Sequence, residues 1–77
     1  MKTIDVGKGH TVVADEVKGV FDYGSRGLIR LKQTFEKKGL AVDLTGGSKI
    51  KSVILLDAYL VLSSVTSETI NKRVENA

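Results

Sequence analysis

One stretch of the sequence decides the fold: residues 39–56, which read GLAVDLTGGSKIKSVILL. Its first glycine is placed to end a helix in the left-handed conformation, and residues 40–44 are then expected to form a strand. Two glycines within residues 45–48 permit a tight turn. Residues 53–56 are apolar at every position, which is typical of a strand that is buried on both faces. The stretch therefore predicts a helix end followed by two strands that are joined by a glycine-containing, basic turn.

The segments on either side of this stretch extend the same pattern. Short alternating or apolar runs predict further strands at residues 3–6, 11–14, 17–21 and 59–63. A main helix is predicted between Ser25, its expected N-cap, and Gly39. A shorter C-terminal helix is predicted to begin after Thr66.

The order of these elements predicts one α+β domain over residues 1–77. We expect a small, mostly antiparallel sheet of five to six short strands, with one main helix and a short C-terminal helix. The chain has 77 residues and no cysteine, so no disulfide and no thiolate metal site can stabilise it. Its longest apolar run is far shorter than the roughly 20 residues of a membrane-spanning helix. We therefore expect a soluble, cytoplasmic protein without a membrane partner.

The apolar hairpin at residues 53–62 predicts self-association. Both faces of this hairpin are apolar, and one main helix with one short helix can hardly cover both. We expect a homo-oligomer whose interface includes Val53, Leu55, Tyr59 and Val61. The alternative is that the C-terminal helix folds back over the second face.

Positive charge is concentrated in the middle third of the chain. Residues 26–51 hold seven Lys or Arg against two acids, a net of +5, whereas residues 1–25 and 52–77 each have a net of −1. Such asymmetry favours a polyanionic partner, chiefly nucleic acid. The alternative is an ordinary solvated helix face that is rich in lysine.

Two parts of this basic segment are candidates for contacts with phosphates. Arg26, Arg30 and Lys37 lie opposite the apolar stripe of the main helix, at 100° per residue, with no acid among them. In the turn, Gly47 lets backbone amides approach an anion closely, and Lys49 and Lys51 follow it. A plain hairpin turn with solubilising lysines explains the second group equally well.

Catalysis is not expected from this sequence. The single histidine, His10, stands beside a turn without an obvious carboxylate or serine partner. The aspartates lie at or near predicted strand ends, where a turn or capping role is usual. No cluster of His, Cys or paired acids is spaced to bind a metal. We predict a protein that is not an enzyme and has no cofactor.

The whole chain resembles the RemA family of bacterial regulators of extracellular-matrix (biofilm) genes. The most specific stretches are GLAVDLTGG at residues 39–47 and KSVILLD at residues 51–57. They are similar to the family's "glycine, apolar, Ile-Asp-Ala-Thr, x, Gly" segment and to its "Val-Ile-x-x-Asp" strand. The segment 60–65, the pair Glu68-Thr69 and Arg73 are similar to the family's closing strand and helix. The resemblance spans roughly residues 4–74.

The resemblance implies a transcription regulator that binds double-stranded DNA and assembles into closed homo-oligomeric rings. In the family, DNA is contacted by a pair of arginines after the turn glycine and by another near the second strand. This chain has Ser48-Lys49 at the first place and Glu16 at the second. Lysine offers phosphate a point charge without bidentate geometry, and glutamate repels it.

Two rival interpretations remain, and the first of them follows from these departures. The chain could be an oligomeric scaffold that has lost DNA binding, which would be indifferent to loss of Lys49 and Lys51. It could instead be a subunit of a larger complex that uses its apolar hairpin for a different partner.

Overall fold

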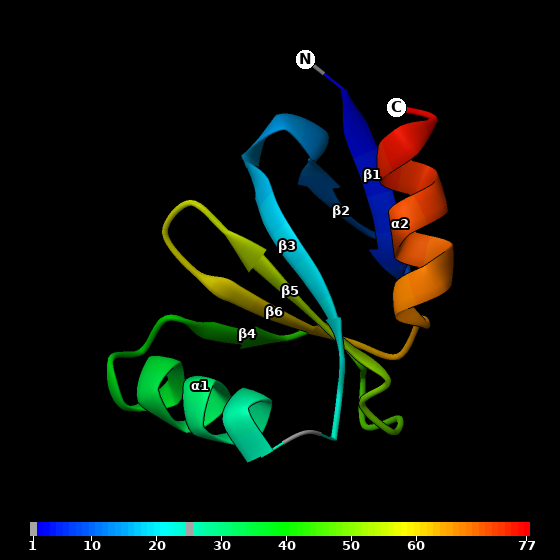
Figure 1. The fold of residues 1–77 in the computed structure, drawn as a ribbon. Helices are drawn as coiled ribbons and strands as arrows, with labels where there is room; N and C mark the ends of the chain where they lie inside the picture. Colours follow the sequence, from blue (N-terminus) through cyan, green and yellow to red (C-terminus); the bar gives the residue numbers. More distant parts are fainter. Residues whose placement is uncertain (1, 25) are drawn as a thin grey trace.

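The computed structural model describes residues 2–24 and 26–77, which form two helices and two β-sheets (Figure 1). The predicted helix cap at Ser25 lies outside the described residues. In chain order the elements are β1 (Thr3–Gly7), β2 (His10–Val13), a 3-10 turn (Ala14–Glu16), β3 (Val17–Asp22), α1 (Arg26–Lys37), β4 (Ala41–Asp43), β5 (Ser52–Leu56), β6 (Leu60–Ser63) and α2 (Ser67–Glu75). The predicted α+β class is confirmed, and the predicted strands and helices all occur within a residue or two of their expected positions.

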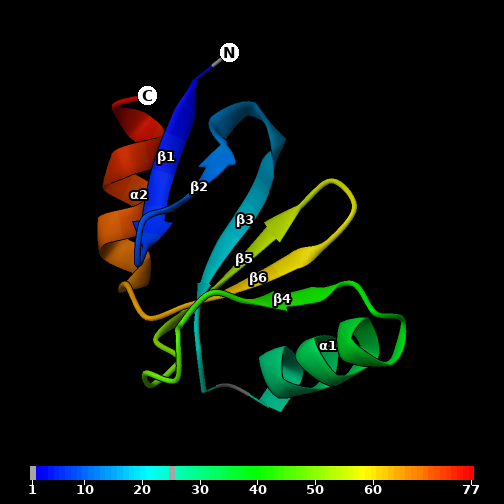
Figure 2. The same cartoon turned by 180° about the vertical axis from the view of Figure 1, so that it is seen from behind.

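The strands form two sheets, where the sequence predicted one. β1 and β2 make a separate antiparallel hairpin, and the other four strands are ordered β3-β5-β6-β4. The β3–β5 and β5–β6 pairs are antiparallel, whereas β4 pairs with β6 in parallel. Figure 2 shows the hairpin and α2 together on one side of the molecule and α1 on the other. The hairpin is separate because it packs on the larger sheet through side chains instead of extending its edge.

Both faces of the larger sheet are covered within one chain. Because successive strand residues point to opposite faces, β5 and β6 divide their apolar side chains between two clusters. Ile54, Leu56 and Val61 pack with apolar residues of the β1–β2 hairpin and with Ile70 of α2. The opposite cluster joins the rest of β5 and β6 to α1; its members are Val53, Leu55, Leu60, Leu62, Leu28, Leu31, Phe35, Ile50 and Tyr23.

This arrangement corrects the predicted oligomer interface. Val53 and Val61 are 0% exposed in the single chain, so they have no surface to offer a second copy. Leu55 and Tyr59 are partly buried. The premise that two helices cannot cover both faces was wrong because the β1–β2 hairpin shares one face with α2. Among the described residues, the large apolar side chains that remain exposed are Phe21, Ile29, Leu40 and Val42.

Two buried serines connect the larger sheet to the elements around it. Ser63 at the end of β6 donates from Oγ to the carbonyl oxygen of Val6 at 2.6 Å, and the same Oγ accepts from the N–H of Val65 at 3.0 Å. Ser52 at the start of β5 donates to the carbonyl oxygen of Val65 at 2.6 Å. These bonds fix the tip of the β1–β2 hairpin against the segment that leads into α2.

The start of α2 is capped as the sequence predicts. The Thr66 side chain accepts a hydrogen bond from the N–H of Thr69, which satisfies one of the unpaired donors of the first turn. Ser67, the first residue of the helix, also donates to the carboxylate of Asp22 at the end of β3. The cap and this contact place α2 beside the end of β3.

Candidate nucleic-acid interface

The segment between β4 and β5, residues 44–51, is a loop with a defined shape. The N–H of Ser48 donates to the carbonyl oxygen of Thr45 at 3.1 Å, which closes a four-residue turn. The two central residues, Gly46 and Gly47, have φ of 61° and 91°, in the left-handed region that glycine adopts without strain. Gly47 is exposed in this turn.

Asp43, the acid that directly precedes this loop, is hydrogen-bonded to a residue within it. Asp43 accepts at Oδ1 from the Thr45 hydroxyl at 2.6 Å and from the Thr45 N–H at 2.9 Å. These two bonds lower the pKa of Asp43 below its ordinary value, and the hydroxyl bond has the larger effect. The positive charge of Lys32 lowers the pKa by a smaller amount. The Asp43 carboxylate is therefore hydrogen-bonded to the first residue of the turn, and it forms no ion pair with Lys49 or Lys51.

The backbone of the loop is held on both sides where it enters β5. The N–H of Lys51 donates to the carbonyl oxygen of Ser63 at 2.9 Å, and the carbonyl oxygen of Lys51 accepts from the N–H of Tyr23 at 3.2 Å. The side chains of Lys49 and Lys51 are exposed. Both lysines precede β5, which begins only at Ser52.

The basic residues of α1 divide along the length of the helix. Arg26, Arg30 and Lys37 are all exposed. Arg26 begins the helix three residues after Tyr23, whose N–H is bonded to the carbonyl oxygen of Lys51. Lys37 ends the helix about 16 Å away along its axis, at 1.5 Å per residue. Arg26 is therefore at the end of α1 that follows the Tyr23–Lys51 bond, and Lys37 is at the opposite end.

The ion pairs within the described residues leave the predicted basic groups uncompensated. They join Lys18 to Asp57, Lys32 to Glu36, Lys72 to Glu68 and Arg73 to Asp5, at 3.2 to 3.9 Å. Across residues 2–24 and 26–77, none of the five predicted cationic side chains pairs with a carboxylate. Unpaired cations on an ordered surface are suited to binding an external anion.

The 3-10 turn that contains Glu16 lies far from this loop. Figures 1 and 2 both show the connection between β2 and β3 at one end of the molecule and the connection between β4 and β5 at the other. Glu16 is partly buried in that turn. Within one protomer, its charge therefore does not interrupt the surface formed by the loop lysines.

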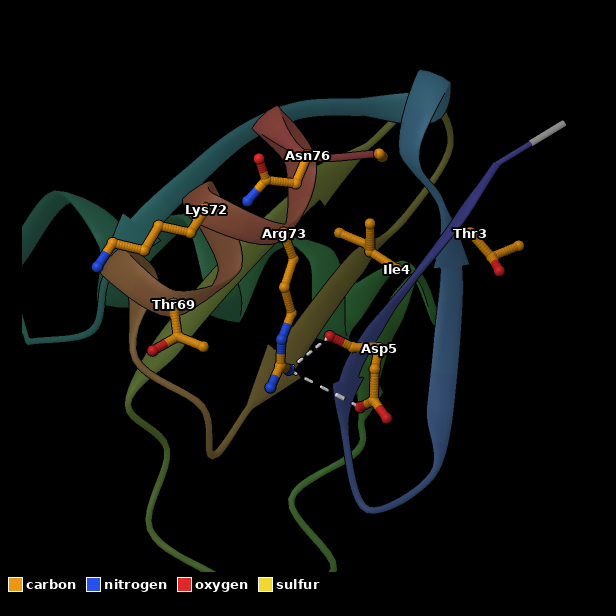
Figure 3. A pocket seen from close by; sticks show the side chains of 8 residues that line it. Thr3, Ile4, Asp5, Thr69, Lys72, Arg73 and Asn76 are labelled. Atoms are coloured by element: carbon orange, nitrogen blue, oxygen red, sulfur yellow. Dashed lines mark hydrogen bonds and ion pairs between the residues drawn. The ribbon is translucent and has the colours of Figure 1, made fainter.

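A second concave feature lies between β1 and α2 (Figure 3). It has a volume of about 420 Å³ and is lined by Thr3, Ile4, Asp5, Thr69, Lys72, Arg73, Asn76 and Ala77. The Arg73 guanidinium reaches from α2 to β1, where it donates to the carbonyl oxygen of Asp5 at 2.8 Å and lies 3.9 Å from its carboxylate. This arginine connects two elements of the protomer and is not available as an isolated charge.

From the sequence, the Gly7-Lys8-Gly9 turn is a weaker candidate for an anion contact than the loop, since no helix follows it, but the structure places Lys8 beside the loop. Lys8 is exposed in the turn between β1 and β2, and its methylene groups lie over Gly46. The only sequence signal was its position between two glycines. His10, by contrast, is exposed, and the described residues contain no group of three His, Cys, Asp or Glu able to bind a metal.

Comparison with known proteins identifies the class. Residues 3–74 match the family model described as "RemA-like: Extracellular matrix regulatory protein A-like". This match spans almost the whole domain, including both sheets, both helices and the basic loop. The chain belongs to the RemA-like family.

The relatives are named as regulators. A Desulfotalea psychrophila protein is 34% identical over 76 residues, which cover 97% of this chain and 68% of the relative. A Nitratidesulfovibrio vulgaris (Miyazaki F) protein is 36% identical over 73 residues, covering 94% and 83% respectively. Both carry the name "Putative regulatory protein", and these names describe regulation instead of catalysis. Neither helix in the described part of the chain is long and apolar enough to cross a membrane.

Proposed function

We propose that this protein is a cytoplasmic, homo-oligomeric regulator that binds double-stranded DNA through its phosphates. The observation that carries the proposal is the ordered loop after β4, on which Lys49 and Lys51 are exposed without a carboxylate partner. Arg26, and then Arg30, extend this surface along the near end of α1. Lysine contacts of this kind position a protein on the duplex without reading its sequence.

The proposed oligomer matters because one protomer offers few contacts. Phosphate binding depends on how many phosphates are neutralised together, and a ring would repeat the basic loop at regular intervals. Three exposed apolar side chains are available for contacts between copies: Ile29, Leu40 and Val42. Ile29 belongs to α1, Val42 belongs to the edge strand β4, and Leu40 directly precedes that strand. Membership of the RemA-like family supports the same assembly. Light scattering on the purified protein tests the proposed oligomer, and a monomeric mass would contradict it.

The DNA-binding part is tested by titrating a fluorescent duplex at several salt concentrations. The wild-type affinity should fall as salt rises, with a log–log slope of about −0.9 for each phosphate neutralised. The double variant Lys49→Gln/Lys51→Gln should bind more weakly and with a shallower slope. Its control is Lys18→Gln/Lys72→Gln, which removes the same charge from residues that are ion-paired elsewhere. Absence of wild-type binding to any duplex at low salt would refute DNA binding.

A second candidate function is an oligomeric scaffold without DNA binding. It is favoured by Ser48, an uncharged residue in the turn at a place where the resemblance leads us to expect arginine. In the same titration the scaffold predicts an intact oligomer that binds no duplex. The two functions therefore separate in one pair of experiments.

A further inference from the structure

The turn between β1 and β2 has an unusual backbone. Lys8 has φ of 55°, and it is the only residue other than glycine with positive φ in the described part of the chain. Its neighbours Gly7 and Gly9 have φ of 108° and 78°, and the N–H of Gly7 donates to the Asp5 carboxylate at 2.6 Å. A lysine in this conformation is disfavoured, because its Cβ crowds the following carbonyl oxygen. The turn nevertheless presents Lys8 in one defined direction.

That direction is across the basic loop. A methyl group placed on the Cα of Gly46 would lie 3.9 Å from Cγ and Cε of Lys8 and 4.0 Å from its Cδ. Three successive methylene groups at almost the same distance mean that the stem of Lys8 lies flat over Gly46. The ammonium group is one bond beyond Cε, so it sits at the surface of the turn that precedes Lys49.

The two turns are fixed relative to each other. Ser63 bonds to Val6 just before the β1–β2 turn, and a methyl on Gly7 would lie 3.0 Å from Cγ2 of Val65, which shows how closely the turn packs there. Thr45, which begins the second turn, is 1% exposed. The approach of Lys8 to Gly46 is therefore determined by buried parts of the fold.

The surface between the two turns is suited to an anionic oxygen. Lys8 has no carboxylate partner among the described residues, since Asp5 is engaged by Gly7 and Arg73. Likewise, within residues 2–24 and 26–77, the N–H groups of Gly46 and Gly47 have no hydrogen-bond acceptor. Successive free amides in a turn form a concavity that binds anions.

We propose that Lys8 is a further DNA-contacting residue, which binds a phosphate of the same backbone as Lys49 and Lys51. This inference rests on the proposed function. Lys8 lies beside a loop that is almost forty positions later in the chain, so the proposed basic surface includes two turns instead of one. Because the contact is to phosphate, it adds affinity for every duplex sequence equally.

The test compares single variants in the duplex titration. Lys8→Gln should reduce the steepness of the salt dependence by about 0.9 for each protomer in contact, equally for duplexes of unrelated sequence. Lys8→Arg should keep the wild-type slope. The matched control is Lys18→Gln, which removes one charge from an exposed lysine that is paired with Asp57.

A second variant separates binding from folding. Lys8→Gly removes the charge and also the strain of a left-handed lysine, so it should weaken binding while its urea midpoint is equal to or above that of the wild type. If Lys8→Gln matches Lys18→Gln while Lys49→Gln weakens binding, the role of Lys8 is refuted and the proposed function stands. If the wild type binds no duplex, both fall.

Discussion

Oδ1 of Asp43 accepts two hydrogen bonds from Thr45, one from its hydroxyl and one from its backbone N–H. These two bonds lie at the start of the loop that carries Lys49 and Lys51, because the turn closed by the Ser48 N–H starts at Thr45. An acid in the basic part of the chain thus has a structural task. It shapes the surface without neutralising it.

Removing the Thr45 hydroxyl should destabilise the protein. Thr45→Val keeps the shape of a buried side chain but deletes a charge-assisted hydrogen bond, so the free energy of unfolding should fall by about 1–2 kcal/mol. Urea denaturation measures this loss. Thr11→Val is the control, because Thr11 is exposed on β2, and its effect should stay within about 0.5 kcal/mol. Equal effects of the two variants would show that the Asp43–Thr45 bond contributes nothing.

The same bond predicts a pH dependence. The pKa of Asp43 is lowered in the folded state, so its contribution to stability is fully present above the unfolded-state pKa of about 3.9 and is lost as pH falls through the folded value. The urea midpoint of the wild type should therefore decrease more steeply below about pH 4 than that of Asp43→Asn. Parallel pH profiles for the two proteins would contradict the prediction.

Ser63 should be essential for holding the β1–β2 hairpin on the sheet. Ser63→Ala leaves the carbonyl oxygen of Val6 and the N–H of Val65 without their partner in a buried site. The expected loss is about 1–3 kcal/mol in the free energy of unfolding, measured by thermal or urea denaturation. The neighbouring Ser64→Ala, at a partly exposed residue, should change stability far less. The reverse order would show that the hairpin is held by other contacts.

Val61 should contribute to stability and not to assembly. It is fully buried between the sheet and the β1–β2 hairpin, so Val61→Ala should lower the free energy of unfolding by about 2 kcal/mol. The mass of the folded protein in light scattering should remain that of the wild type. A change in oligomer mass at a concentration where the variant is folded would restore Val61 to the interface.

The two ends of α1 should differ in DNA binding. Arg26 is three residues from Tyr23, whose N–H is bonded to Lys51, whereas Lys37 is at the opposite end of the helix. Arg26→Gln should therefore weaken duplex binding more than Lys37→Gln, although each removes one exposed charge. Anisotropy titrations at a single low salt concentration are sufficient for this comparison. Equal effects would indicate that binding depends on total charge alone.

Local pattern was a good guide to the elements of this fold. The continuous apolar run at 53–56, the Thr66 cap and the glycine turn at 45–48 each occur where the sequence placed them. These features depend on residues that are neighbours in the chain. Element type follows from such short-range chemistry, because side-chain period and turn geometry are local properties.

Relationships between distant segments could not be predicted in the same way. Nothing local shows that β1 and β2 form a sheet of their own, or that they cover the face containing Val61. For the same reason Val53 and Val61 were assigned to an interface, and the turn that holds Lys8 was ranked below the loop although Lys8 lies over Gly46. Each depends on packing between residues far apart in sequence. Arg26 and Lys37 of α1 looked equivalent on a helical projection, which carries no information about position along the helix axis.

The bond from Ser63 to Val6 also has a consequence for how the molecule is made. It joins residues 57 positions apart, and α2, which packs on β1, follows still later. During synthesis the β1–β2 hairpin therefore cannot pack on β6 and α2 until those elements have been translated. Folds dominated by such non-local contacts close slowly, because chain entropy is lost before the contacts form. We expect refolding to be limited by the packing of β6 and α2 on the hairpin, so β1 and β2, although made before β6 and α2, are among the last strands to become stable.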